Sequence, residues 1–532
     1  MYLSSMKELP ISIQTFEEII SRQMVYVDKT AFVHALISKG KYYFLSRPRR
    51  FGKSLLLTTI KAYFHGKKSL FEGLYLYDKV DEWFIHPVIH IDYSLVDYRS
   101  GLATFKESLR NHLLLQAAQY QVELTSRSPS DVLVELVQKL QAQSQQAVVI
   151  LVDEYDKPLV DMLAQEERFY ENREILRGFY GAMKGLDDQL RFVMLTGVSR
   201  FTKVGVFSGM NNLQDISVDE SYSTLLGFTQ QELEDNFQEH LHALGQKFSQ
   251  AASDLLPVIQ EWYNGFSFDG RQKLYNPFSI LSLLIEKQFR NYWFSTGTPS
   301  FLLDLIMAKK QLPETFEHLK VNDLTGSAMQ VSQLPLIPLL FQTGYLTIEE
   351  AGLDGFEPYY YLNYPNREVR HSFLVYIAAA FKQKDQFDIQ PEALALRDAL
   401  IEEDIDWFVQ RLESFLADIP ARLHLPREAY YHSLTYLMLR IVGARPLLEK
   451  ETSKGRIDAV LEFPDKLYII EFKFARKKQV KNPSTLSQKA LKQIKDNGYV
   501  QPYLGQGKRI LLLGLGFLNQ HIHARLEKWP ES

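Results

Sequence analysis

The chain contains 532 residues, of which 46% are hydrophobic and 23% are charged, a composition that excludes a largely disordered or fibrous protein. At about 150 residues per domain, this length predicts about three or four domains. The 60 basic and 64 acidic residues leave a net charge of −4, and cysteine is absent, which excludes disulfides, thiolate metal ligands and cysteine nucleophiles.

Two kinds of segment that direct proteins to membranes are missing from the sequence. The N-terminal residues contain no charged stretch that leads into an apolar run, as a secretory signal requires. No stretch reaches the roughly 18 uninterrupted apolar residues that a membrane-spanning helix needs. We therefore expect a cytoplasmic protein that has no membrane partner.

Residues 1–225 alternate apolar runs that are typical of buried strands with helical patterns. Such alternation predicts an α/β domain with a mostly parallel sheet. The runs that predict strands are residues 42–45, 88–91, 148–152 and 192–195.

The pattern becomes helical in residues 226–300. Thr229 and Glu232 have the spacing of a capping box, in which the two side chains satisfy free amides at a helix start. Turn-rich aromatic segments at 263–266 and 275–277 interrupt the helices.

Helices and strands mix in residues 301–375, where segments 343–348 and 359–362 predict a β-hairpin. Helical signals then fill residues 376–425, and residues 426–532 return to strands. The predicted helix near residue 410 has helical spacing of its apolar residues, which are Phe408, Leu412, Phe415 and Leu416.

A predicted strand, a basic loop, Gly52-Lys53-Ser54 and a helical run follow one another from residue 42 to residue 60. In a phosphate-binding loop of this kind, backbone amides point at the phosphates, Lys53 reaches the terminal phosphates and Ser54 holds Mg²⁺. Arg47 occupies the position where the general pattern G-x-x-x-x-G-K-S has its first glycine. Taken alone, the motif is equally compatible with a chance Gly-Lys-Ser. The expected nucleotide-binding residues of the loop are Arg49, Arg50, Phe51, Gly52, Lys53, Ser54 and Leu55.

A second motif favours nucleotide binding, because the apolar run 148–152 ends in Asp153 and Glu154. Ligands of open α/β sheets bind beyond the carboxyl ends of the strands. There Asp153 is expected to hold Mg²⁺ and Glu154 to polarise the attacking water; the alternative is a strand that ends in solvated acids. At the end of the next predicted strand, Thr196 is a candidate contact to the γ-phosphate, or a plain strand terminus.

Two further runs, 455–461 and 467–473, predict a hairpin centred between Pro464 and Asp465. This centre places Asp458 opposite Glu471, and Glu471 shares a strand face with Lys473. Metal-dependent phosphodiester hydrolysis needs such a set, in which carboxylates hold Mg²⁺ and a base orients water. The alternative is an edge hairpin with a surface salt bridge.

The segment from Ile470 to Arg509 is strongly basic. It contains ten Lys or Arg residues and two acids, so its net charge is +8 and the rest of the chain carries −12. A basic stripe beside a metal site suits a phosphate backbone, although charge runs are more often solvated faces. We favour nucleic acid here, with DNA as the expected substrate.

Several motifs resemble those of the predicted AAA-ATPase-like proteins of bacteria. The resemblance lies in residues 26–30, 47–54, 153–158 and 207–213, and continues through 262–265, 275–277, 344–347 and 365–369. An arginine-rich phosphate loop is usual in that family. The resemblance implies a helical lid after the ATPase core, followed by a winged-helix-like module.

The C-terminal hairpin resembles the PD-(D/E)XK nuclease fold, which the same family carries at its C-terminus. This resemblance implies that Asp458 and Glu471 are metal ligands and that Lys473 positions the nucleophile. Residues 430–432 and Gln493 match accessory positions of the fold.

These observations predict an α/β multidomain chain that binds and hydrolyses ATP, coupled to a Mg²⁺-dependent nuclease. The expected domains are an ATPase core (1–225), a helical lid (226–300), a winged-helix-like module (301–375), a helical connector (376–425) and a nuclease-like domain (426–532). One alternative is a nucleotide-regulated switch that binds nucleic acid or protein without cutting, and another is an ATPase that remodels proteins. The number of copies is left open, with a homo-oligomer as one option.

Overall fold

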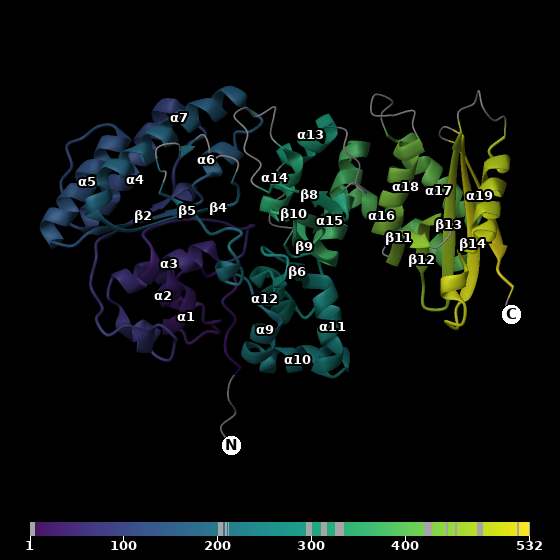
Figure 1. Cartoon of the computed structure of the whole chain (residues 1–532), viewed down its shortest axis with the longest axis horizontal. Coiled ribbons are helices and arrows are strands. Elements are labelled where there is room, and N and C mark those ends of the chain that lie inside the picture. Colours follow the sequence, from purple (N-terminus) through teal and green to yellow (C-terminus); the bar gives the residue numbers. More distant parts are fainter. Residues whose placement is uncertain are drawn as a thin grey trace, which may run out of the picture. The chain divides into compact units, whose positions relative to one another are not determined.

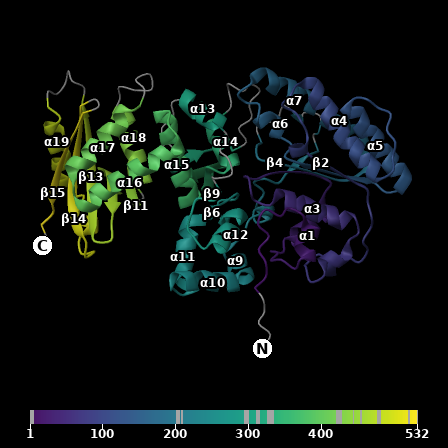
Figure 2. The same cartoon turned by 180° about the vertical axis from the view of Figure 1, so that it is seen from behind.

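The computed structural model (Figures 1 and 2) describes residues 6–200, 206–207, 210, 212–293, 300–309, 316–324, 335–419, 428–442, 445–452, 455–475, 482–518 and 521–530. The chain forms two compact units, the first comprising Met1–Leu302 and Phe316–Val369, the second Leu303–Thr315 and Arg370–Ser532. Two of the three boundaries fall within helices α13 (Ser300–Lys309) and α15 (Arg367–Lys382). Within the described ranges, no helix is both long and apolar enough to cross a membrane.

A parallel five-stranded sheet with the order β2-β3-β4-β1-β5 lies at the centre of the first unit. The four apolar runs predicted as strands are confirmed, and their buried residues explain why the runs are continuous rather than alternating. The strands are β1 (Tyr42–Ser46), β2 (Val88–Asp92), β3 (Val148–Asp153), β4 (Leu190–Gly197) and β5 (Gln214–Asp215).

Helices cover both faces of this sheet. Figure 1 shows α4, α5 and α7 on one face and α1, α2 and α3 on the other, with the same layers seen from behind in Figure 2. Because all strands are parallel, β1 and β3 end at the same edge, where the phosphate loop and Asp153 follow. The helices are α1 (Phe16–Ser21), α2 (Thr30–Lys39), α3 (Lys53–Phe64), α4 (Leu102–Gln119), α5 (Pro129–Ser144), α6 (Lys157–Val160) and α7 (Glu166–Met183).

A helical region follows, as predicted for residues 226–300. The capping box is confirmed: Thr229 Oγ1 accepts a hydrogen bond from the Glu232 amide (3.1 Å), and the Glu232 carboxylate accepts one from the Thr229 amide (2.8 Å). The aromatic turn segments form a two-stranded antiparallel ribbon. The elements are α9 (Gln230–Asn236), α10 (Gln238–Phe248), α11 (Ala252–Tyr263), β6 (Asn264–Phe266), β7 (Leu274–Tyr275) and α12 (Pro277–Glu286).

The predicted hairpin after residue 343 is present but begins later than expected. Helix α14 continues to Thr343, Gly344 then adopts a φ of 90°, and the first strand begins at Thr347. The helical spacing of Leu336, Leu339 and Leu340 buries one face of α14, and a left-handed glycine is the usual helix stop. The elements are β8 (Leu319–Val321), α14 (Leu336–Thr343), β9 (Thr347–Asp354) and β10 (Glu357–Asn363), in the sheet order β8-β10-β9.

The second unit contains a five-stranded sheet with the order β11-β12-β13-β14-β15, in which only β13 and β14 are parallel among the described strands. Helix α19 packs closely on one face, because Gly514 and Gly516 of β14 lack side chains; a Cβ on Gly516 would lie 2.5 Å from the Pro483 carbonyl. The opposite face meets α16, where Tyr468 Oη donates to the Leu400 carbonyl (2.7 Å).

Along the second unit, helices α16 to α18 are followed by strands β11 to β13. The four apolar residues predicted to share a helix face are all buried in α17. The elements are α16 (Gln386–Glu402), α17 (Ile405–Ala417), α18 (Glu428–Ile441), β11 (Arg445–Thr452), β12 (Gly455–Glu462), β13 (Lys466–Ala475), α19 (Ser484–Asp496), β14 (Arg509–Leu518) and β15 (His521–Lys528).

A buried carboxyl group fastens the helical region of the first unit. Glu368 is 0% exposed and accepts hydrogen bonds from Ser279 Oγ (2.8 Å) and from the Trp293 amide (2.7 Å). Burial raises the pKa of Glu368 to about 7, and these hydrogen bonds oppose the shift in part. The side chain therefore joins α12 to the segment that contains Trp293.

We expect Glu368 to make the first unit less stable as the pH rises from about 4.5 to about 7. The unfolded chain releases this proton near the ordinary value of 4.5, whereas the folded chain keeps it until about 7. The unfolded state thus binds fewer protons in this window, so stability falls by up to about 3 kcal/mol. Denaturant unfolding of Glu368→Gln at pH 5 and pH 8 should show a flatter pH dependence than the unmodified protein.

The exposed Glu286 of α12 supplies the control, since its side chain is 44% exposed. Glu286→Gln should keep the pH dependence of the unmodified protein. Identical pH profiles for Glu368→Gln and the unmodified protein would contradict the assignment.

Candidate functional site

The loop between β1 and α3 ends in a left-handed glycine and a buried lysine. Gly52 caps α3 with a φ of 95°, and Lys53 is the first residue of the helix. Lys53 is buried, and its Nζ donates to the carbonyls of Arg47 (2.9 Å) and Pro48 (3.0 Å). Burial lowers the pKa of Lys53, which the negative charge of Asp153 opposes. An anion in the loop would compensate the desolvated ammonium, so this donor set fits a phosphate group.

Arg47, which replaces the first glycine of the general pattern, supports the loop from behind. Its guanidinium is buried, donates to the carbonyls of Ser217 (2.5 Å) and Tyr222 (3.1 Å), and lies 3.8 Å from the centre of the Phe268 ring. Burial lowers the pKa of Arg47 to about 9. Arg47 does not line the cavity, so the residue anchors the loop rather than contacting a ligand.

Residues of the helical region hold the loop from the other side. Trp293 Nε1 (3.1 Å) and Asn276 Nδ2 (3.3 Å) both donate to the Arg49 carbonyl. The Arg50 guanidinium lies 4.7 Å from the Phe278 ring centre. The resemblance included the motif around residue 276 but did not indicate its contacts. These contacts connect residues more than 220 positions apart, so no local sequence pattern predicts them.

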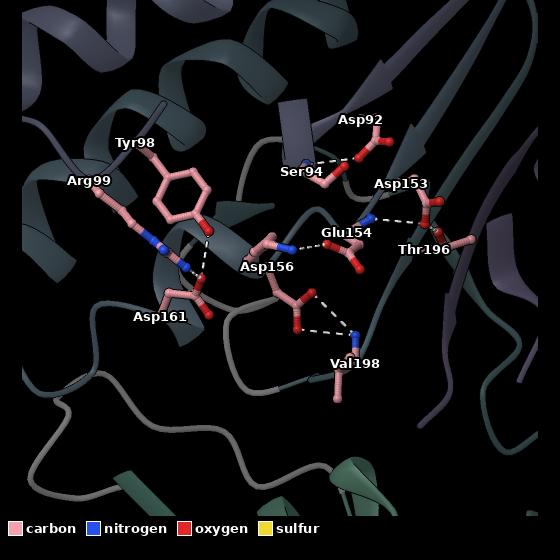
Figure 3. A network of polar contacts seen from close by, with 11 residues as sticks. Asp92, Ser94, Tyr98, Arg99, Asp153, Glu154, Asp156, Asp161, Thr196 and Val198 are labelled. Carbon is pink, nitrogen blue, oxygen red and sulfur yellow. Dashed lines mark hydrogen bonds and ion pairs between the residues drawn. The ribbon is translucent and has the colours of Figure 1, made fainter. Parts of the chain in front are cut away.

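The ends of β3 and β4 arrange the acidic residues (Figure 3). Asp153 Oδ1 accepts hydrogen bonds from Thr196 Oγ1 (2.7 Å) and from the Glu154 amide (3.0 Å). Thr196 is fully buried and does not line the cavity. In this position the Thr196 hydroxyl orients the Asp153 carboxylate, and the contact of Thr196 with a γ-phosphate stays a prediction.

Glu154 and Asp156 point in different directions from the turn after β3. Glu154 has a φ of 52°, and its Oε2 lies 2.6 Å from Lys157 Nζ. Asp156 is buried and accepts hydrogen bonds from the Ser199 amide (2.6 Å) and the Val198 amide (3.2 Å), as Figure 3 shows for Val198. Burial raises the pKa of Asp156. The turn after β3 is therefore fixed to the end of β4, a role that sequence reasoning did not assign to Asp156.

One cavity of about 600 Å³ brings the predicted nucleotide-binding residues together. Ser54 and Asp153 both line it and offer a hydroxyl and a carboxylate oxygen, which are ligands that Mg²⁺ accepts beside phosphate and water. The predicted residues that line the cavity are Arg49, Arg50, Phe51, Gly52, Lys53, Ser54, Leu55, Asp153 and Glu154.

The second unit brings two carboxylates together on β12 and β13. The pairing of Ala459 with Ile470 sets the register that places Asp458 beside Glu471. Asp458 Oδ2 accepts a hydrogen bond from the Phe472 amide (2.7 Å). Glu471 is 1% exposed and lies on the central strand, which rules out the alternative of an edge hairpin with a surface salt bridge.

The Glu471 carboxylate is only partly satisfied within the protein. Its Oε1 lies 2.8 Å from Lys473 Nζ, whereas its Oε2 is buried without a hydrogen-bond partner among the described residues. Burial, and then the charge of Asp458, raise the pKa of Glu471 to about 7. A buried orphan oxygen beside a second carboxylate fits a divalent cation, which would relieve both effects.

Neither site has a complete set of protein ligands for a metal. No group of three or more His, Asp or Glu side chains forms a metal-binding arrangement in the part of the chain that the structure describes. Mg²⁺ commonly binds through one or two carboxylates and completes its shell with water or phosphate oxygens. This coordination preference of Mg²⁺ fits both pairs, which are Ser54 with Asp153 and Asp458 with Glu471.

The basic segment 470–509 is less cationic than its composition suggests. Acids elsewhere in the second unit pair with Lys495, Lys508 and Arg509, while Lys489 and Lys492 of α19 are exposed. The other cations of the segment, apart from Lys473, lie outside the described residues, namely Arg476, Lys477, Lys478 and Lys481.

The accessory positions of the nuclease-like site are described only in part. Gln493 Nε2 lies 3.5 Å from Tyr499 Oη. The side chains of residues 430–432 lie outside the described part of the chain.

Comparisons with known proteins match both parts of the chain that contain these sites. Residues 10–207 match the family model described as a predicted AAA-ATPase, and residues 426–525 match the model of the PD-(D/E)XK nuclease superfamily. A protein of Azotobacter chroococcum mcd 1, described as an uncharacterized protein in the vnfD 5' region, is 37% identical over 519 residues, which cover 96% of this chain and 97% of that protein. Among solved structures, the Aeropyrum pernix ORC2 protein, in ADPNP and ADP complexes, covers 71% of this chain and 97% of its own at 12% identity and a TM-score of 0.24, and we base no argument on it.

Replacing Arg47 with the glycine of the general pattern should destabilise the protein. Arg47→Gly removes two charge-assisted hydrogen bonds, to the Ser217 and Tyr222 carbonyls, and leaves the Tyr222 carbonyl with the Leu225 amide (3.2 Å) as its donor. Losing both bonds should cost about 3 kcal/mol in total. Denaturant unfolding of the first unit measures this loss.

Arg50→Gly, in the same loop, is the matched control. Arg50 is exposed and already has a φ of 67°, which glycine adopts without strain, so its effect should stay below about 1 kcal/mol. Equal stability losses in the two variants would contradict the anchoring role of Arg47.

Proposed function

Because this chain belongs to the bacterial predicted AAA-ATPases that carry a PD-(D/E)XK nuclease-superfamily domain, we propose that it hydrolyses ATP in its first unit and cleaves nucleic acid in its second. We propose further that the nucleotide state controls cleavage. The observation that carries the nuclease assignment is the buried pair of Asp458 and Glu471, with one unpartnered carboxylate oxygen.

The cavity of the first unit supports the ATPase assignment. Lys53 neutralises phosphate charge, and Asp153 with Ser54 would hold the metal ion, which shields the phosphates when bound. Thr196 fixes the Asp153 carboxylate through the 2.7 Å hydrogen bond. Glu154 orients water for attack on the terminal phosphate once its carboxylate is released from Lys157.

The second unit has the groups that phosphodiester hydrolysis requires. A divalent ion at Asp458 and Glu471 would polarise the phosphate and lower the pKa of bound water. The Phe472 amide holds Asp458 in place. An ammonium has three donors, of which Lys473 directs two to Glu471 Oε1 and to the Phe472 carbonyl. The third would position the attacking water.

Nucleic acid, with DNA as the first substrate to test, suits the second unit better than the β9–β10 hairpin of the first. Residues 347–363 contain no Lys or Arg, and their acids give the hairpin a charge of −4 through Glu349, Glu350, Asp354 and Glu357. A phosphate backbone would be repelled there. The exposed Lys489 and Lys492 of α19 offer contacts that do not depend on base sequence.

Contacts within the first unit support control of cleavage by nucleotide. Trp293 donates to the Arg49 carbonyl of the phosphate loop, and its amide donates to Glu368. Glu368 lies in the first turn of α15, a helix that begins in the first unit and continues into the second. Phosphate binding can act along this route only if ATP binds two conformations with different affinity.

The two proposed activities should be separable by mutation. Asp458→Asn should reduce the rate of Mg²⁺-dependent DNA cleavage by at least about 100-fold, because the metal loses a charged ligand. ATP hydrolysis should continue. Lys53→Ala should abolish ATP binding and hydrolysis, because the phosphate charge is no longer neutralised. Cleavage of labelled DNA and phosphate release from ATP, measured on the same preparations, test both statements.

Binding of DNA by Asp458→Asn, measured over a range of salt concentrations, separates the nuclease from a switch that binds without cutting. Retained, salt-sensitive binding without cleavage supports the nuclease assignment when the unmodified protein cuts. Binding without cleavage by the unmodified protein, in Mg²⁺ or Mn²⁺ and with or without ATP, would contradict it.

A further inference from the structure

An arginine outside the phosphate loop also lines the nucleotide cavity. Arg99 lies in the segment between β2 and α4, and its side chain is 65% exposed. Its Nη2 lies 2.6 Å from Asp161 Oδ2, another cavity residue. Figure 3 shows this pair in the same network view as Glu154 and Asp156.

The backbone beneath Arg99 is fixed, although its guanidinium is exposed. Asp97 Oδ1 accepts a hydrogen bond from the Arg99 amide (3.0 Å), and the preceding Tyr98 is buried. The buried Asn172 donates to the Tyr98 carbonyl (3.3 Å) and to the Pro158 carbonyl (2.8 Å), so the segment is tied to α6. Because the Arg99 guanidinium is exposed and its backbone is held by hydrogen bonds, the guanidinium can change partners without a shift of the backbone that lines the cavity.

Asp161 can release Arg99 without being left unsatisfied. Tyr98 Oη donates to the same Oδ2 at 2.5 Å, so the carboxylate keeps a hydrogen bond when the guanidinium leaves. The ion pair itself is weak in free energy, because the arginine is largely in solvent. The free-energy cost for Arg99 to leave Asp161 and bind a more highly charged group is therefore small.

The charges that line the cavity favour an anionic ligand. Six cations face four carboxylates, which leaves a formal charge of +2. The cations are Lys29, Arg49, Arg50, Lys53, Arg99 and Lys157, and the carboxylates are Asp153, Glu154, Asp156 and Asp161. Lys29 forms an ion pair with Glu232, and Lys157 forms one with Glu154. Arg99 is paired with Asp161, which also accepts a hydrogen bond from Tyr98.

We propose that Arg99 leaves Asp161 to contact the terminal phosphate of a bound nucleoside triphosphate. The residue would thereby distinguish triphosphate from diphosphate and stabilise the charge that develops on the phosphate during hydrolysis. Guanidinium groups bind phosphate oxygens through paired hydrogen bonds, and a correctly placed arginine accelerates phosphoryl transfer strongly. This inference rests on the proposed ATPase function and assigns the cation within the same chain.

Arg99→Ala provides the direct test. ATP affinity should fall by about tenfold or more while ADP affinity changes by less than about twofold, and the turnover of ATP should fall by roughly 100-fold. Arg99→Lys should recover part of the turnover, because an ammonium supplies charge without the paired geometry. Titration of the full-length protein with ATP and with ADP, together with phosphate release, gives these values.

Arg177→Ala is the matched control, because Arg177 is also exposed (54%), is ion-paired with an acid at 2.7 Å, and lies outside the cavity. It should leave both affinities and turnover unchanged. Equal loss of ATP and ADP affinity in Arg99→Ala, or turnover within twofold of the unmodified protein, would overturn the inference alone. Absence of ATP binding by the unmodified protein would overturn it together with the proposed ATPase.

Discussion

A charge that is removed from water must find a partner, and this requirement shapes both sites of the protein. Unpaired buried ions cost several kcal/mol each, yet the Lys53 ammonium, the Arg47 guanidinium and the Glu471 carboxylate are all buried. The Arg47 guanidinium donates to backbone carbonyls and packs on an aromatic ring, while its Nε has no hydrogen-bond partner among the described residues. Lys53 and Glu471 are satisfied only in part by the protein. We therefore propose a phosphate group as the further partner of Lys53 and a metal ion as the further partner of Glu471.

The same requirement accounts for the unusual phosphate loop. A glycine-rich loop cradles phosphate through its freedom of conformation, whereas this loop is held from outside. Arg47 fastens it to the segment from Ser217 to Tyr222, and Trp293 fastens the Arg49 carbonyl to the helical region. Because the loop is hydrogen-bonded to several segments, a small shift of the loop when phosphate binds would also displace the residues that contact it.

The sequence predicted those parts of the structure that local patterns determine. Continuous apolar runs identified four of the five described strands in the parallel sheet of the first unit, and equal distance from the hairpin centre placed Asp458 beside Glu471. Contacts between distant residues left no such pattern, so the supporting roles of Arg47, Trp293 and Glu368 emerged only from the fold. Thr196 was assigned to the phosphate because it ends a strand, but burial turned its hydroxyl to Asp153. Thr343 was predicted to begin a strand, although the apolar spacing before it continues a helix through that residue.

We propose that ATP bound in the first unit controls cleavage in the second, and Glu154→Gln gives the most direct test of this control. The variant keeps Lys53, Ser54 and Asp153 for nucleotide and metal but loses the carboxylate that orients water, so it should accumulate with ATP bound. Cleavage of DNA in Mg²⁺ would be followed after a single addition of ATP. We expect cleavage to persist in Glu154→Gln and to decay in the unmodified protein as ATP is consumed. Equal cleavage by both proteins, with and without ATP, would show that the two sites act independently and would overturn control by ATP.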